Sequence, residues 1–170
     1  LKKRPVAIII TAVIIILSTI FSVHRTLGAE CQRVRDSFFT GVVSEGYAHK
    51  SISDQLKTRI DAANVVASIT ANYSQAENET KNLRDARNRL IDTLNEAKSG
   101  EASLKNVYNA NKELQAAFED LEKSLEGVKL STREAENFEN NRSKFYGAQA
   151  AIEKAGYNEA VREFYRTTLN

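Results

Sequence analysis

The sequence is poor in the residues that carry much of the recognisable chemistry of proteins. Its 170 residues include one cysteine, two histidines, one proline and no tryptophan or methionine. Because a disulfide needs two cysteines, the single Cys31 excludes an intrachain bridge and leaves the redox compartment open. Glu30 stands where a lipoprotein signal has a small residue, which argues against lipidation of Cys31. The lack of methionine predicts that the chain is a piece of a longer protein.

Metal-ligating and catalytic patterns are also missing from the sequence. His24 and His49 are far apart and form no Glu-x-x-His or His-x-x-x-His arrangement, so we expect no metal and no cofactor. Residues 41–46 have one residue too many for a Gly-x-Ser-x-Gly elbow and are interpreted as a hinge. Acidic residues such as Glu119 and Glu122 are interpreted as the solvated face of an amphipathic helix. We therefore expect no enzymatic activity.

One stretch of 19 residues, from Pro5 to Val23, contains no charged side chain, whereas the whole chain has a mean hydropathy of −0.42. At about 1.5 Å per residue, such a helix reaches roughly 28 Å, close to the roughly 30 Å of a bilayer's hydrocarbon core. A cleaved signal peptide is the alternative. Its best cleavage point follows Ala29, but Leu27 occupies a position where a small residue is needed. The sequence therefore favours an uncleaved transmembrane anchor.

The charges indicate how this anchor is oriented. Lys2, Lys3, Arg4 and Arg25 flank the apolar stretch, and the other 20 basic residues face 22 acidic ones, a net charge of −2. The part after the anchor thus lacks the positive field that phosphate binding requires, and we expect no nucleic-acid partner. The cationic N-terminus is expected to stay in the cytoplasm, which places the remainder on the other side of the membrane.

A stripe of small and weakly polar residues follows one face of the expected membrane helix. At about 100° per residue, its members fall within about 60° of one another; they are Ala7, Thr11, Ser18 and Ser22. Small residues let helices approach closely, so this face predicts self-association in the bilayer. The alternative is that the hydroxyls bond back to their own helix and face lipid. The sequence leaves both interpretations open.

The rest of the chain has few helix breakers, which predicts long helices. They are expected over about residues 51–73, 78–98, 101–126 and 132–169. Capping patterns begin the first and the last of them at Ser51 and Ser131, and Gly100 ends the second. Their expected buried positions include Leu56, Leu83, Leu90, Leu114, Phe118, Phe145 and Ile152. Short connections force neighbouring helices to run antiparallel.

The fold class expected from these patterns is all-α, with a single N-terminal transmembrane helix followed by an up-down antiparallel bundle of about four long helices. Strand-like alternation is absent. The domains are residues 1–27 as the anchor, 28–50 as a juxtamembrane stalk or hinge, and 51–170 as the bundle. In the stalk, Phe38 and Phe39 lie either at the bilayer surface or in the bundle core.

Two segments of the expected bundle carry specific motifs. They are residues 55–61, with Gln55, Leu56, Arg59 and Asp61, and residues 157–164, with Tyr157, Asn158, Val161 and Phe164. In this order after an N-terminal span, they resemble the LemA family of bacterial membrane-anchored helical proteins. Asn64 stands where the family has a proline, and residues 30–50 depart from its usual first helix. The resemblance implies a bundle of long helices on a single span in the bacterial inner membrane, with no established enzymatic activity. Spacing predicts that the motif residues mainly pack.

The function expected from these observations is structural. The anchor fixes the bundle to the lipid bilayer, and the bundle forms a homo-oligomer or recruits another membrane protein. The alternative is a regulatory adaptor or sensor for another membrane protein, such as a protease or a signalling complex. A sensor is expected to contain a ligand cavity or a long exposed apolar groove.

Overall fold

The computed structural model describes residues 18, 22, 25–44, 47–155, 157, 161–163 and 166, and these are mostly helical. A helix over residues 25–40 comes first in the continuous part. The elements that follow are β1 (Val42–Ser44), β2 (Tyr47–His49), α2 (Ile52–Thr70), the 3-10 turn η1 (Ser74–Ala76), α3 (Glu77–Ser99), α4 (Leu104–Ser124) and α5 (Thr132–Glu153). The all-α class is confirmed, apart from one short hairpin.

The apolar stretch of the expected transmembrane anchor, residues 5–23, lies outside the described residues, except for Ser18 and Ser22, which are helical and exposed. No helix in the described part of the chain is both long enough and apolar enough to cross a membrane. Ala7 and Thr11 also lie outside the described residues. The anchor and its association stripe therefore stay predictions.

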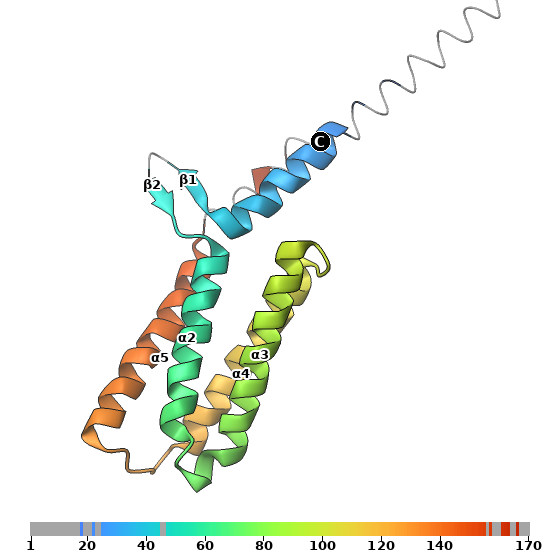
Figure 1. The fold of residues 1–170 in the computed structure, drawn as a ribbon. Coiled ribbons are helices and arrows are strands. Elements are labelled where there is room, and N and C mark those ends of the chain that lie inside the picture. The colour runs from blue at the N-terminus through green and yellow to red at the C-terminus, as the bar shows by residue number, and fades with distance from the viewer. Residues whose placement is uncertain are drawn as a thin grey trace, which may run out of the picture.

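The four long helices form a bundle in which each helix runs antiparallel to the one before it (Figure 1). Helix α2 packs against α5 on one side and α3 on the other, and α3 also pairs with α4. The main chains of α4 and α5 approach less closely, and long side chains connect these two helices. The expected bundle is thus observed, with its helices arranged as two close pairs, α2 with α5 and α3 with α4.

Serine side chains cap the N-termini of the helices as the sequence predicts. Ser51 Oγ accepts a hydrogen bond of 2.9 Å from the backbone N–H of Asp54. Ser131 and Glu134 form a full capping box, in which each side chain accepts from the other residue's backbone N–H. At the C-terminus of α3, Gly100 adopts the left-handed conformation with φ 95°, which a side chain would disfavour. These local signals fix where the helices begin and end.

The core of the bundle consists of apolar side chains from all four long helices. Phe118 of α4 stacks on Phe145 of α5, with 4.0 Å between ring centroids and 10° between ring planes. The most completely buried apolar residues include Leu56, Val66, Leu83, Leu90, Val107, Leu114, Phe118, Leu121 and Phe145. Most of them occupy positions that the helical periodicity predicts, so the sequence alone predicts most of the buried face of each helix.

A two-stranded hairpin occupies the segment that was interpreted as a hinge. Strands β1 and β2 pair antiparallel, with Val42 opposite His49 and Ser44 opposite Tyr47. The expectation that the chain has no strands is wrong here, because three residues a side are too few for an alternating pattern to be recognised. The expected bend is present at Gly41, which ends the preceding helix with φ 82°.

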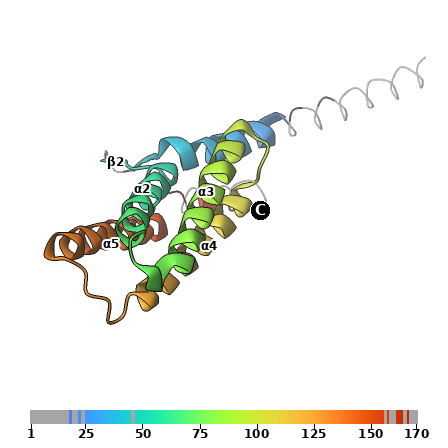
Figure 2. The same ribbon diagram turned by 60° about the horizontal axis from the view of Figure 1, so that its bottom comes forward.

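The helix over residues 25–40 lies across one end of the bundle and packs onto it (Figure 2). Phe38 is 6% exposed, and its ring meets Tyr157 edge-on, with centroids 5.6 Å apart. Val34 is also buried. Arg35 Nη2 donates a hydrogen bond to the carbonyl of Ala97 near the C-terminus of α3. Of the two sites expected for Phe38, the bundle core is the one observed.

Helix α5 ends at Glu153 and does not continue unbroken toward the C-terminus. Lys154 has φ −94° and ψ 2°, and the N–H of Ala155 bonds to Ile152 O at 3.2 Å, which closes a tight turn. Gly156, a weak point for a helix, follows directly in the sequence. Helical residues recur at position 157 and over 161–163. The single long helix that the periodicity allowed is therefore not formed.

Candidate functional site

An arginine lies at the centre of the bundle. Arg59 of α2 is 0% exposed, and its guanidinium stands over the Phe145 ring at 4.0 Å from the centroid. Its Nη1 donates to the side-chain oxygens of Asn111 and Gln149, the latter at 2.6 Å, and its Nη2 donates to Gln115 Oε1. The guanidinium thus joins α2, α4 and α5. We call Arg59 and these three amides the arginine centre.

No carboxylate among the described residues forms an ion pair with Arg59, although such pairing is usual for a buried cation. Two carboxylates are connected to it through the amides. Gln115 Nε2 donates to Glu119, and Gln149 Nε2 donates to Glu153 at 2.9 Å. The charge is therefore compensated at a distance, by two acidic residues at the edge of the bundle.

Burial makes it easier for the guanidinium of Arg59 to lose its proton. It lowers the pKa of Arg59 well below its ordinary value, to about 10, although Tyr146, Glu119 and Glu153 act in the opposite direction. The group is still protonated at neutral pH. Its buried Nε has no hydrogen-bond partner among the described residues. Because unpaired buried donors are unfavourable, the arginine centre is a costly feature of the fold.

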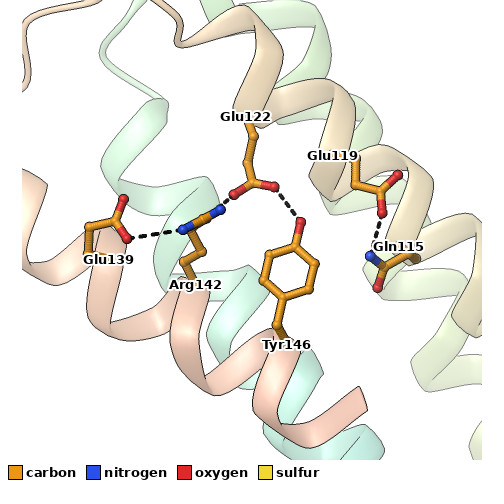
Figure 3. A network of polar contacts seen from close by, with 6 residues as sticks. All are labelled: Gln115, Glu119, Glu122, Glu139, Arg142 and Tyr146. Atoms are coloured by element: carbon orange, nitrogen blue, oxygen red, sulfur yellow. Dashed lines mark hydrogen bonds and ion pairs between the residues drawn. The ribbon is translucent and has the colours of Figure 1, made fainter. Parts of the chain in front are cut away.

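A second polar cluster connects α4 with α5 at the side of the bundle (Figure 3). Glu122 of α4 accepts hydrogen bonds from Arg142 and from the hydroxyl of Tyr146, both on α5. Burial and the bond to Glu122 raise the pKa of Tyr146, and Glu122 also raises the pKa of Arg142. The Tyr146 ring packs edge-on against Phe118, with centroids 5.8 Å apart. This cluster, the α4–α5 clasp, holds the two less closely packed helices together.

A partly open cavity of about 260 Å³ lies beside the arginine centre. Its polar wall consists of Asn111 and Gln149, which belong to the arginine centre, and Glu153, which accepts a hydrogen bond from Gln149. Tyr108, which is 61% exposed, and Tyr157 also line it. The remaining walls are apolar and consist of Phe38, Ile52, Leu56, Leu104, Val107 and Ile152. The cavity thus adjoins α2, α4, α5 and the helix over residues 25–40.

The structure places the predicted motif residues in different environments. Leu56 is buried and, together with Tyr157, lines the cavity, so the two motif segments meet there. Arg59 forms the arginine centre, whereas Asp61 is exposed. Gln55 and Val161 are half-buried. Asn158 and Phe164 lie outside the described residues.

Sequence reasoning missed the amides that surround Arg59. The signal was present, because Asn111 lies four residues after Val107 and three before Leu114, on the buried face of α4. Arg59 likewise lies three residues after Leu56, on the buried face of α2. A polar residue inside an apolar stripe indicates a buried polar contact, but neither residue alone reveals its partner.

Among the described residues, no group of three or more histidine, cysteine, aspartate or glutamate side chains is placed to hold a metal ion. Comparison of the chain with protein-family models, curated proteins and solved structures finds no match.

Proposed function

We propose that this chain is a membrane-anchored scaffold whose helical bundle self-associates or recruits a partner protein of the cell envelope. The observation that supports this is the packing of the helix over residues 25–40 onto the bundle. Phe38 lies in the core, and Arg35 bonds to the C-terminal end of α3. The apolar stretch over residues 5–23 comes directly before this helix in the sequence. An anchor there would hold the bundle in a fixed position above the bilayer, and not on a flexible tether.

The proposal includes membership of the LemA family and a place in the bacterial inner membrane, with the N-terminus in the cytoplasm and the bundle outside. It includes no catalytic activity and no cofactor. The meeting of Leu56 and Tyr157 at one cavity supports the family proposal. Two motifs about 100 residues apart in the sequence form one structural unit there.

The topology can be tested at Cys31, the single cysteine of the chain, which is exposed. We expect a membrane-impermeant maleimide to label the full chain in intact cells, because Cys31 follows the anchor and lies outside the cytoplasm. A Cys31→Ser chain is the control for unspecific labelling. Labelling that requires cell lysis would contradict the proposed orientation.

Self-association can be tested with substitutions on the stripe of the expected membrane helix. A Thr11→Leu, Ser18→Leu chain should show fewer crosslinked oligomers in membranes, because larger side chains separate the helix backbones. The matched control is Ile9→Leu, Ile16→Leu, which changes the opposite face by the same helical periodicity. An equal loss of crosslinked oligomers in both chains, or no loss in either, would remove the stripe from the proposal.

A second candidate function, that of an adaptor or sensor for another membrane protein, is favoured by the cavity of about 260 Å³. A scaffold needs no such space, whereas a sensor needs a site for a ligand. Crosslinking of the full chain in its membrane, with and without added small molecules, distinguishes the two functions. Under the sensor function, the recovered partners change with the ligand; under the scaffold function, they do not.

A further inference from the structure

The polar wall of the cavity carries two opposite charges at different depths. Arg59 is fully buried behind Asn111 and Gln149, whose oxygens accept its hydrogen bonds. Glu153 is exposed and lines the cavity next to Gln149. The cavity wall is therefore positive near the two amides, through which the charge of Arg59 acts, and negative at the carboxylate of Glu153. A ligand with the opposite arrangement of charges is electrostatically favoured there.

The two amides that line the cavity, those of Asn111 and Gln149, have hydrogen-bond donors beyond the bonds they already make. Gln149 Oε1 accepts from both Arg59 and Asn111 Nδ2, and Asn111 Oδ1 accepts from Arg59. Each amide nitrogen carries two hydrogens. One hydrogen of Asn111 bonds to Gln149 and one of Gln149 bonds to Glu153, which leaves one on each nitrogen beyond these bonds. Hydrogen bonding to a cation polarises both amides and strengthens them as donors.

The remaining walls of the cavity are apolar and suit an apolar group. Ile52, Leu104 and Val107 form part of a surface that would not solvate a charge, and Phe38 and Tyr157 add aromatic rings. A cavity of about 150 Å³ is known to hold a benzene ring. The cavity of about 260 Å³ therefore has room for such a ring and for a small polar head beside it.

We propose that this cavity binds a free α-amino acid with a large apolar side chain, of the phenylalanine or leucine type. The carboxylate of the ligand accepts hydrogen bonds from the amides of Asn111 and Gln149, on the side of Arg59. Its ammonium group pairs with Glu153, and its side chain fills the apolar part. This ligand class rests on the second candidate function, that of a sensor.

The test measures binding to the full chain in detergent by isothermal titration calorimetry. L-phenylalanine should bind, and compounds that lack one recognised group should bind at least about tenfold more weakly. The compounds are phenethylamine without the carboxylate, 3-phenylpropanoate without the ammonium, L-phenylalaninamide with a neutral carboxamide, and glycine without the side chain. No binding of phenylalanine, or equal binding of any of these compounds, would overturn the proposed ligand class.

Two substitutions on α5 locate the site. Glu153→Gln should weaken phenylalanine binding at least about tenfold, because the ammonium loses its partner, and should not weaken any binding of 3-phenylpropanoate, because this compound has no ammonium and its carboxylate is repelled by Glu153. Glu136→Gln is the matched control, since Glu136 is exposed on the same helix and does not line the cavity. Both side chains are exposed, so we expect both variants to fold. Equal effects of the two substitutions would overturn the placement of the ligand.

Different results would contradict the proposed ligand class and the proposed sensor function. If phenylalanine binds but crosslinked partners do not respond to it, the sensor function is contradicted and the ligand class is supported. If another compound of the series binds more tightly and changes the partners, the ligand class is overturned and the sensor function is supported.

Discussion

Replacement of Arg59 by lysine should make the stability of the bundle depend on pH in a range where residue 59 of the wild-type protein contributes no such dependence. Burial lowers the pKa of Arg59 from its ordinary value to about 10, and this shift corresponds to about 3 kcal/mol at about 1.4 kcal/mol per tenfold change in proton affinity. At lower pH the arginine is protonated in both the folded and the unfolded protein, so the full free-energy cost of burying its charge applies there. A lysine at this position meets the same burial, but its ordinary pKa is lower.

The sign of the effect follows from the direction of the shift. Burial lowers the pKa of the lysine in the folded state below its unfolded value, so the folded protein releases the proton first as pH rises. The stability of the Arg59→Lys variant should therefore increase with pH, by up to about 3 kcal/mol relative to wild type. Near neutral pH the variant should be less stable, by roughly 1.5–3 kcal/mol for each lost bond to the amides, because an ammonium cannot replace a planar guanidinium.

Unfolding of the full chain in detergent by guanidinium chloride, followed by circular dichroism, measures the free energy of unfolding of the variant and of the wild type at about pH 7 and about pH 9.5. Groups that titrate in both chains cancel in the comparison. The control is Arg142→Lys, because the side chain of Arg142 is 47% exposed and its pKa is raised, not lowered. A difference between Arg59→Lys and wild type that stays constant with pH would refute the account of a desolvated cation without a direct carboxylate partner.

Three further substitutions test the packing and the helix ends by denaturant unfolding. Gly100→Ala should destabilise by about 1–2 kcal/mol, because Gly100 has φ 95° and its added Cβ would lie 3.4 Å from the Arg35 guanidinium. Gly147→Ala is its counterpart inside α5, where the added Cβ meets nothing within 4 Å, and should stabilise by about 0.5–1 kcal/mol. Phe118→Ala should destabilise by about 3–5 kcal/mol, because it removes a 0% exposed ring that stacks on Phe145. Equal effects of the two glycine substitutions, or a loss below about 1 kcal/mol for Phe118→Ala, would contradict these contacts.

The helices could be predicted because their signals are local. Ser51 and Ser131 cap α2 and α5, and Gly100 ends α3, since each of these roles depends on residues within one turn. The buried positions of Leu83 and Phe118 follow from the helical repeat in the same way. Such patterns need no knowledge of which helices lie side by side.

The arginine centre could not be predicted, because its contacts join residues far apart in the sequence. Arg59 bonds to Asn111, 52 residues away, and to Gln149, 90 residues away. The cavity has the same origin, since Phe38, Leu104 and Tyr157 come from three different segments. The hairpin was missed for a different reason: its strands, Val42–Ser44 and Tyr47–His49, are too short to show a period.

The most direct test of the proposed scaffold is the mass of the particle that contains the full chain after gentle extraction from its own membrane. Native mass spectrometry or mass photometry of the crosslinked particle gives the number of copies and the presence of a partner. The proposal predicts a membrane-bound particle with more than one copy, or one copy with a stoichiometric partner. A chain that washes out of the membrane at alkaline pH, or that is a strict monomer without a partner, would contradict the proposal.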